Sequence, residues 1–231
     1  MGPKVKSETA IVAKTTTTKT PQPSKSYTTF ETVAKRSLDL IALQAPVERI
    51  MALAPTTPPI DLSDMTRAAV VLAVAAMDAY FTDVFAERFV PFLKKKGATK
   101  AMVQLLEDAG LNTECALELL AMDRPYRRIR KLVEAYHQHI TTQRHTVIDE
   151  LFLAYGLKDF SSNVEKLKRR KTLLKSLTTL VQRRHCIAHE GDLNAHSRVR
   201  AIDPAKTKTR IEDLIAFVSG ADELLQRQLP I

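Results

Sequence analysis

Residues 183–190, Arg-Arg-His-Cys-Ile-Ala-His-Glu, gather the side chains of this chain that are best suited to chemistry. A histidine whose pKa lies near neutrality can take up or release a proton at a reacting oxygen. An arginine can offset the negative charge that develops on a phosphate or another oxyanion. Arg184, His185 and His189 are therefore the candidate catalytic residues of the sequence.

Arg184 occupies an unusual place in the pattern around it. With 100° between successive residues of a helix, it falls at the centre of an apolar stripe, and His185 and His189 lie on the shoulder of that stripe. The apolar members are Leu173, Leu174, Leu177, Leu180, Val181, Ile187 and Ala188. A guanidinium is costly to desolvate unless it is paired. Ionisable groups on an apolar face are candidates for a functional site.

Asp78 is a second ionisable residue that interrupts an apolar stripe. The other members of its stripe are Val70, Val74, Met77, Phe81, Val84 and Phe85. We expect the acid and Arg184 to pair across two packed helices. Such a pair either fixes the register of the helices or positions the arginine for a reaction, and the residues alone leave both interpretations open.

A zinc site is the alternative use of the two histidines. His185 and His189 have the i, i+4 spacing of helical zinc ligands, but Cys186 stands where zinc proteases place a glutamate. Further histidines are available, although residues two apart on a helix point to different sides; they are His137, His139 and His145. We expect neither a metal nor another cofactor, and Cys186 is the residue that keeps zinc open.

Helices are the elements that must position these residues. The 231 residues are 45% apolar with six glycines and no tryptophan, a composition that favours helices over sheets. Capping-box pairs, Thr28 with Glu31 and Ser162 with Glu165, mark two helix starts. Asp203 before Pro204 marks the start of the last helix, and Gly191 is placed for a left-handed cap.

These boundaries predict a series of separate helices with no strands. The expected helices cover residues 28 to about 43, 61 to about 89, one or two helices within 101–120, 126 to about 153, 162 to about 190, and 203 onward. A proline-rich loop is expected over residues 46–59. The domain prediction is a disordered basic tail over 1–27, an N-terminal helix with the proline-rich loop over 28–60, and a helical domain over 61–231.

The formal net charge of +9 suits a polyanionic partner. The tail of residues 1–27 is rich in Lys, Thr, Ser and Pro, and is either an electrostatic arm that finds RNA or a solvated segment without a role. We expect no secretory signal and no membrane contact, because the longest apolar run, residues 68–77, is far shorter than the roughly 20 residues that a span needs. The expected location is the cytoplasm.

Residues 184–189, Arg-His-Cys-Ile-Ala-His, resemble the signature of HEPN domains, and in particular of their RiboL-PSP-HEPN subgroup. That signature has an arginine, a polar residue, then an isoleucine, a small residue and a histidine, often followed by an acidic pair such as Glu190 and Asp192. Residues 66–80 are similar to the first core helix of the subgroup, with Asp78 included, and residues 211–225 fit its last helix. The resemblance covers about residues 60–228.

The resemblance implies an all-α bundle of four to five core helices that dimerises so that two motifs face one cleft. It further implies a metal-independent endoribonuclease. One His189 would take the proton of a ribose 2′-hydroxyl, the other would protonate the leaving 5′-oxygen, and Arg184 would stabilise the five-coordinate phosphate. The products would be a 2′,3′-cyclic phosphate and a 5′-hydroxyl. His185 would orient His189 or hold a phosphate, and Asp78 would position Arg184.

The spacing sets a geometric condition on this mechanism. Residues five apart on a regular helix point about 140° apart, so Arg184 and His189 would not lie side by side. Gly191 indicates that the helix is ending, and that end would let His189 swing toward the cleft.

Two basic clusters suggest a path for RNA. The predicted RNA-binding residues are Arg127 and Arg128 in one cluster, Lys168, Arg169, Lys171 and Lys175 in the other, and Arg183 in the motif itself. The second cluster would lie about 20 Å from Arg184 along the same helix, although such clusters are usually just solvated faces. The alternative function is a non-catalytic RNA- or nucleotide-binding and dimerisation module. The resemblance also suggests a defence or toxin–antitoxin setting, with an antitoxin or other regulator that the sequence does not identify.

Overall fold

The computed structural model describes residues 22–53, 61–137 and 140–230. These residues form nine helices and no strand, so the predicted all-α fold is confirmed. The helices are α1 (Lys25–Ala52), α2 (Ser63–Lys96), α3 (Lys100–Asp108), α4 (Thr113–Leu120), α5 (Pro125–His137), α6 (His145–Leu153), α7 (Phe160–Lys168), α8 (Leu173–Glu190) and α9 (Pro204–Gln228).

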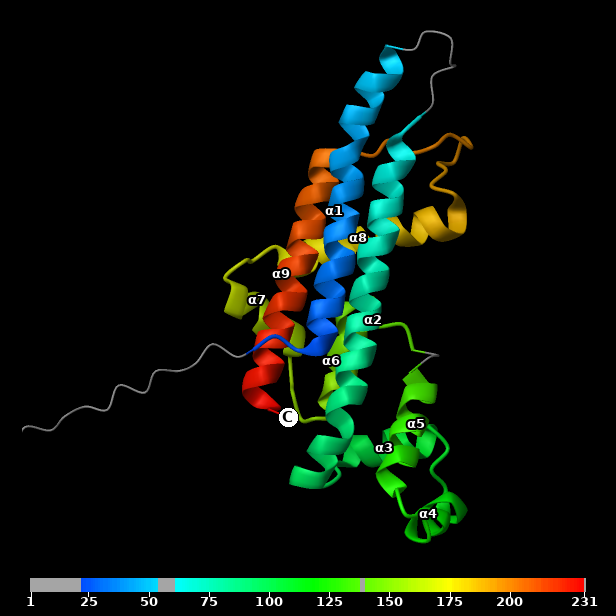
Figure 1. The fold of residues 1–231 in the computed structure, drawn as a ribbon, viewed down its shortest axis with the longest axis vertical. Helices are drawn as coiled ribbons and strands as arrows, with labels where there is room; N and C mark the ends of the chain where they lie inside the picture. Colours follow the sequence, from blue (N-terminus) through cyan, green and yellow to red (C-terminus); the bar gives the residue numbers. More distant parts are fainter. Residues whose placement is uncertain (1–21, 54–60, 138–139, 231) are drawn as a thin grey trace, which may run out of the picture.

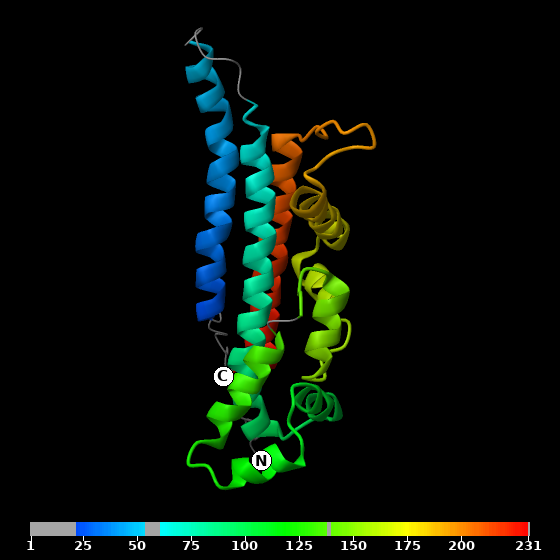
Figure 2. The ribbon, with the colours of Figure 1, turned by 90° about the vertical axis from the view of Figure 1, so that its right-hand side faces the viewer.

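Three long helices, α1, α2 and α9, run side by side along the long axis of the molecule (Figure 1). The short helices α3, α4 and α5 gather at one end, and α6, α7 and α8 cover one side, where α8 runs across the long helices (Figures 1 and 2). The core between them is rich in aromatic rings from the middle of α2 and α9, among them Tyr80, Phe81 and Phe217, each at most 1% exposed. Apolar burial on this scale is the main stabilising contribution to the bundle.

The N-terminal helix is longer than the sequence predicted at both ends. It begins after Ser24, whose hydroxyl accepts a hydrogen bond from the Tyr27 backbone, rather than at Thr28. The loop predicted from Pro46 is wrong as far as residue 52, because α1 continues through that proline. Packing just before the proline holds this part of α1 against α2: Gln44 is buried and accepts a hydrogen bond from Thr66 of α2 at 2.5 Å. Residues 54–59 of the predicted loop and 1–21 of the predicted tail lie outside the described residues.

Two long helices predicted around the motif are each divided in two. Residues 126–153 form α5 and α6, and residues 162–190 fall mostly in α7 and α8. Ser162 lies inside α7, and Glu165 caps the next helix instead, since its carboxylate accepts a hydrogen bond from the backbone N–H of Leu174 at 3.2 Å. Arg169 adopts a left-handed conformation (φ 53°) that ends α7.

Other predicted boundaries are confirmed. Residues 101–120 form two short helices, Gly191 ends α8 in the left-handed region (φ 61°), and the Asp203 carboxylate accepts hydrogen bonds from the first turn of α9. α2 runs past the predicted end near residue 89 and through Pro91 to Lys96. By length and composition α2 could cross a membrane, and 56% of its apolar stretch is buried inside the bundle.

Candidate active site

A cavity of about 670 Å³ lies between the C-terminal half of α8 and the segment that precedes and begins α6. On the α8 side, its lining includes Arg184, His185 and His189. On the other side it is lined by Thr141, Gln143, Arg144 and Val147. The structure thus brings the three predicted catalytic residues to one cavity and adds a second wall that the sequence did not predict.

Arg184 is held between the core and this cavity. Leu177 and Leu180, on the same face of α8, are 1% exposed and anchor the helix in the bundle, so the predicted apolar stripe is present. Arg184 lies one turn beyond Leu180 and two turns beyond Leu177. There its side chain leaves the core and is half-buried. Its Nε is inaccessible to solvent and has no hydrogen-bond partner among the described residues. A guanidinium in this state has donors available for an oxyanion.

His185 and His189 are exposed on the rim of the cavity, one helical turn apart. Their ring centroids are 4.7 Å apart and the rings are inclined by 43°. α8 stays helical through Glu190, so His189 does not swing out as the sequence suggested. It reaches the cavity from the helix itself, because the cavity extends along α8 from Val181 to His189.

The predicted pair between Asp78 and Arg184 is not formed. Asp78 of α2 instead holds the opposite wall: its Oδ1 accepts hydrogen bonds from the backbone N–H of Thr142 at 2.6 Å and from the Thr142 hydroxyl at 2.7 Å. Its Oδ2 accepts a third from Gln143 Nε2 at 3.1 Å. Because Gln143 lines the cavity with Arg184, the acid shapes the site through a loop rather than by direct contact.

A buried ion cluster fixes the end of the motif helix. Asp192, 0% exposed and two residues beyond α8, accepts from Arg183 at 2.6 Å and from Arg67 of α2 at 2.8 Å. Arg183 also donates to the backbone carbonyls of Arg200 and Ala201. The guanidinium of Arg183, which the sequence assigned to RNA binding, is therefore engaged within the protein.

Comparison with known families agrees with this arrangement. The sequence model of the family described as RiboL-PSP-HEPN matches residues 32–227, which include both walls of the cavity and the buried ion cluster. The chain belongs to the RiboL-PSP-HEPN family. No curated protein and no solved structure matches the chain. HEPN membership indicates a ribonuclease or an RNA-binding function.

The basic clusters of this RiboL-PSP-HEPN chain are not on one continuous helix with Arg184. Lys168 ends α7, Arg169 and Lys171 lie in the turn after it, and only Lys175 belongs to α8. Lys168 contacts α9, where its ammonium group lies 3.4 Å from Glu223 and 3.2 Å from Ser219. Arg169, Lys171 and Lys175 are exposed, as are Arg127 and Arg128 on α5. None of these predicted RNA-binding residues lines the cavity.

None of the described histidines considered as extra zinc ligands lines the cavity: His137 lies elsewhere in the fold, and His145 directly follows the lining residue Arg144 without being part of the lining. His137 is buried against Phe85, with ring centroids 4.5 Å apart, and burial lowers its pKa to about 4. His139 lies outside the described residues. Over the described ranges, no group of three or more His, Cys, Asp or Glu side chains is arranged to hold a metal ion.

Gln143 and Arg144 are the site residues that the sequence did not predict. The predicted continuous helix over residues 126–153 would make both of them ordinary surface positions. The signal that could have found them is the pair Thr141-Thr142, because threonine loses side-chain freedom in a helix and its hydroxyl competes for backbone hydrogen bonds.

Proposed function

We propose that this RiboL-PSP-HEPN chain is a metal-independent endoribonuclease whose active site is the cavity between α8 and residues 141–147. The observation that carries the proposal is the charge of the lining. Arg184, His185 and His189 face Arg144 across the cavity, and no carboxylate is among its described lining residues. A cavity with this lining attracts a polyanion and concentrates its field on a bound phosphate.

The residues fit cleavage by the 2′-oxygen of RNA. A neutral histidine removes the proton of the 2′-hydroxyl as the oxygen attacks phosphorus, and a protonated histidine gives its proton to the 5′-oxygen as the P–O5′ bond breaks. The products are a 2′,3′-cyclic phosphate and a 5′-hydroxyl, and the phosphate keeps its formal charge. The guanidinium of Arg184, which lines the cavity, would donate to the non-bridging oxygens, on which charge accumulates in the transition state.

The general base and the general acid must be two different groups. We assign both roles to His189, supplied by two protomers. In a homodimer, His189 of one protomer would act as the base and His189 of its partner as the acid. His185, with its ring one turn away, would orient His189 or hold a phosphate. Arg144 and Gln143, on the opposite wall, would bind the phosphates that flank the scissile bond.

A non-catalytic RNA-binding module is the second candidate, and one observation favours it. Neither His185 nor His189 has a side-chain hydrogen bond to any residue in the described part of the chain, so the protein supplies no partner that orients either ring. A general base is usually oriented by such a partner. In the enzyme, that partner would come from the second protomer or from the RNA.

The deciding experiment incubates the wild type, Arg184→Ala and His189→Ala with end-labelled RNA in excess EDTA and analyses the product ends. His196→Ala serves as the matched control, because His196 is exposed but does not line the cavity. We expect the wild type and the control to leave 2′,3′-cyclic phosphate and the two site variants to lose about 100-fold or more in rate. Equal RNA binding by all four proteins, without cleavage, would establish the binding module instead.

The remaining parts of the proposal concern the setting. An unregulated ribonuclease would damage its own host, so we propose a defence or toxin–antitoxin role in the cytoplasm, with RNA as substrate and an antitoxin or another regulatory protein as partner. Light scattering on the purified chain tests the homodimer directly. A monomer that cleaves RNA would remove the shared cleft from the mechanism.

A further inference from the structure

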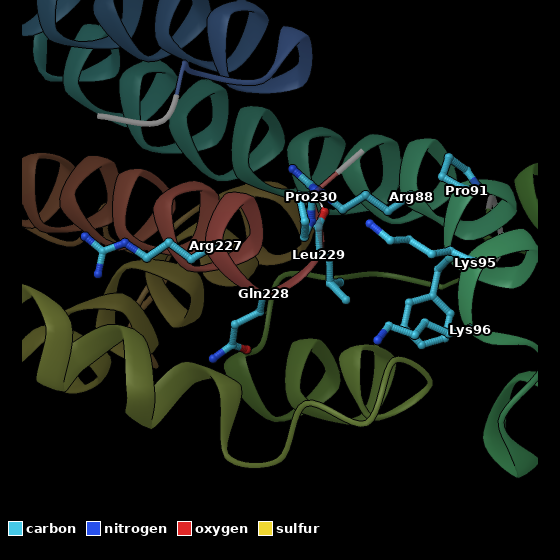
Figure 3. Close-up of a pocket in the computed structure, with 9 residues that line it drawn as sticks. Arg88, Pro91, Lys95, Lys96, Arg227, Gln228, Leu229 and Pro230 are labelled. Atoms are coloured by element: carbon cyan, nitrogen blue, oxygen red, sulfur yellow. Dashed lines mark hydrogen bonds between the residues drawn. The ribbon is translucent and has the colours of Figure 1, made fainter. Parts of the chain in front are cut away.

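A second cavity, of about 250 Å³, lies between the C-terminal turns of α2 and the C-terminal end of α9 (Figure 3). From α2 it is lined by Arg88, Pro91, Phe92, Lys95 and Lys96, and from the α9 end by residues that include Leu229. It shares no lining residue with the cavity at Arg184. The three basic residues lie on one face of α2, because they are separated by seven and eight residues.

Arg88 is a buried cation with donors to spare. It is 1% exposed, and its Nη1 donates to the backbone carbonyls of Leu229 and, at 3.4 Å, Leu225. Its Nε and Nη2 have no hydrogen-bond partner among the described residues. These two nitrogens form the edge of a guanidinium that binds carboxylate or phosphate oxygens in a bidentate manner. Burial also lowers the pKa of Arg88, the sign of a charge that lacks compensation by solvent.

The described lining of this cavity contains no acid, although Asp222 and Glu87 act on Arg88 from outside the lining. Lys95 and Lys96 form no ion pair within the described ranges. Figure 3 shows the Lys95 amine directed toward Arg88 and Leu229. Asp222 is buried and its charge favours the Arg88 guanidinium, but its oxygens already accept hydrogen bonds from Ser24 and Tyr80.

Arg227 is on the rim but is occupied elsewhere. It pairs with Glu223 at 2.5 Å, and its guanidinium points away from the other basic residues in Figure 3. The cavity therefore presents three positive charges and an apolar wall. A dianion matches this charge better than a monoanion, and the ring of Phe92 beside Pro91 is suited to a small organic group.

We propose that this cavity is a binding site for a phosphoryl dianion, either free phosphate or a small phosphate monoester, with Arg88 as its bidentate donor and Lys95 and Lys96 as its flanking cations. Lysines in the last turn of a helix are favourable without any ligand, because they offset the negative end of the helix. That effect accounts for Lys94 to Lys96 but leaves the two buried donors of Arg88 without a partner, which a bound dianion supplies.

Isothermal titration with inorganic phosphate and with phenyl phosphate, at constant ionic strength, tests the site. The key variant is the Lys95→Ser, Lys96→Ser double mutant, which changes only exposed side chains; Arg88→Met removes the donors at similar volume. Lys94→Ser is the control, because Lys94 lies in the same turn but packs over the Tyr126 ring, 4.4 Å from its centroid. We expect a Kd below about 1 mM that weakens about tenfold or more in the double mutant and in Arg88→Met, and less than about twofold in Lys94→Ser.

The two probes distinguish the sources of the phosphoryl group. Tighter binding of phenyl phosphate assigns the site to a monoester, and equal or tighter binding of phosphate assigns it to the free ion. The absence of binding by both probes would overturn the proposal and leave ordered water as the partner of Arg88. An equal loss in Lys94→Ser would also overturn it, because binding would then follow the general charge of α2. None of these outcomes depends on ribonuclease activity.

Discussion

Arg67 of α2 and Asp192, two residues beyond α8, form an ion pair in which Nε lies 2.8 Å from Oδ2 and the carboxylate is fully buried. The same carboxylate oxygen accepts from Arg183 at 2.6 Å. Asp192 thus connects the beginning of α2 to the end of α8. The position of His189 depends on this junction, because the histidine lies three residues before Asp192.

Asp192→Asn should destabilise the fold strongly, because it leaves two guanidinium groups without their shared charge. Breaking a buried pair by removal of one partner costs about 3–5 kcal/mol, and the partial exposure of Arg183 places the effect near the lower end. Urea unfolding measures it. Asp64→Asn is the control, since Asp64 also contacts Arg67 but its side chain is 83% exposed, and it should cost about 0.5 kcal/mol. Equal losses in both variants would contradict a central role for Asp192.

Asp78→Ala should loosen the loop wall of the candidate active site. The carboxylate accepts two hydrogen bonds from Thr142 and one from Gln143, and its loss should cost about 2 kcal/mol of stability. If the proposed function holds, the cleavage rate of the folded fraction should also fall about tenfold, because Gln143 and Arg144 lose their positions. Asp83→Ala, a change at an exposed acid on the same helix, should leave the rate unchanged. A slower Asp83→Ala enzyme would count against loop positioning.

Arg144→Ala should weaken RNA binding and cleavage more than Arg127→Ala or Arg128→Ala. All three arginines are exposed, but only Arg144 lines the cavity with Arg184. Contacts to phosphates contribute through the release of counterions, so the slope of binding against salt should also decrease by about one for Arg144→Ala. Filter binding over a range of salt concentrations measures both effects. A larger loss of RNA binding in Arg127→Ala or Arg128→Ala would instead indicate that RNA binds along α5.

Stability should fall as the pH is lowered from about 6.5 toward 4, because of His137. Burial lowers its folded pKa to about 4 from the ordinary value of 6.5, so the unfolded chain binds the additional proton throughout this window. The linked loss is on the order of 3 kcal/mol at pH 4 and is absent above the unfolded pKa. His137→Leu should flatten this part of the profile in urea titrations at each pH. Parallel profiles for the wild type and His137→Leu would assign the dependence to other groups.

Gly220→Ala should separate α7 from α9. A Cβ at this position would lie 2.8 Å from Cε and 2.9 Å from Cγ of Lys168, and 2.9 Å from Cγ1 of Val164. Overpacking of this kind costs about 1–3 kcal/mol, partly offset by the better helix propensity of alanine. Thermal unfolding of Gly220→Ala in the Lys168→Ala background separates the two contacts. Full recovery there would place the whole conflict on the flexible lysine, and partial recovery is what the Val164 contact predicts.

The sequence predicts the helical fold and the motif because both follow from local periodicity. The apolar stripe around Arg184 marks the candidate catalytic segment in the sequence alone, and the stripe that contains Asp78 marks the central helix. The proline boundaries are less successful: Pro46 and Pro91 remain inside helices because tertiary packing outweighs one lost hydrogen bond and the steric cost of the ring.

The partner of Asp78 could not be predicted, and the reason is physical. The carboxylate oxygens of Asp78 accept hydrogen bonds from the loop between α5 and α6. That loop is present only because the two helices are separate, and the apolar pattern does not show the break between them. Glu165 presents the same difficulty, because its carboxylate caps α8 rather than its own helix. A sequence pattern describes one helix at a time, whereas Asp78 and Glu165 each accept hydrogen bonds from a different segment of the chain.

The two walls of the cavity are anchored by different acids, Asp78 for residues 142–143 and Asp192 for the end of α8. A substitution on the loop therefore changes the width and lining of the cavity while the Arg-His-Cys-Ile-Ala-His helix keeps its place. Selection can act on substrate preference and on reactivity as separate traits in such a fold. If the proposed function holds, the choice of RNA can diverge through residues 141–147 while the catalytic residues of α8 stay the same.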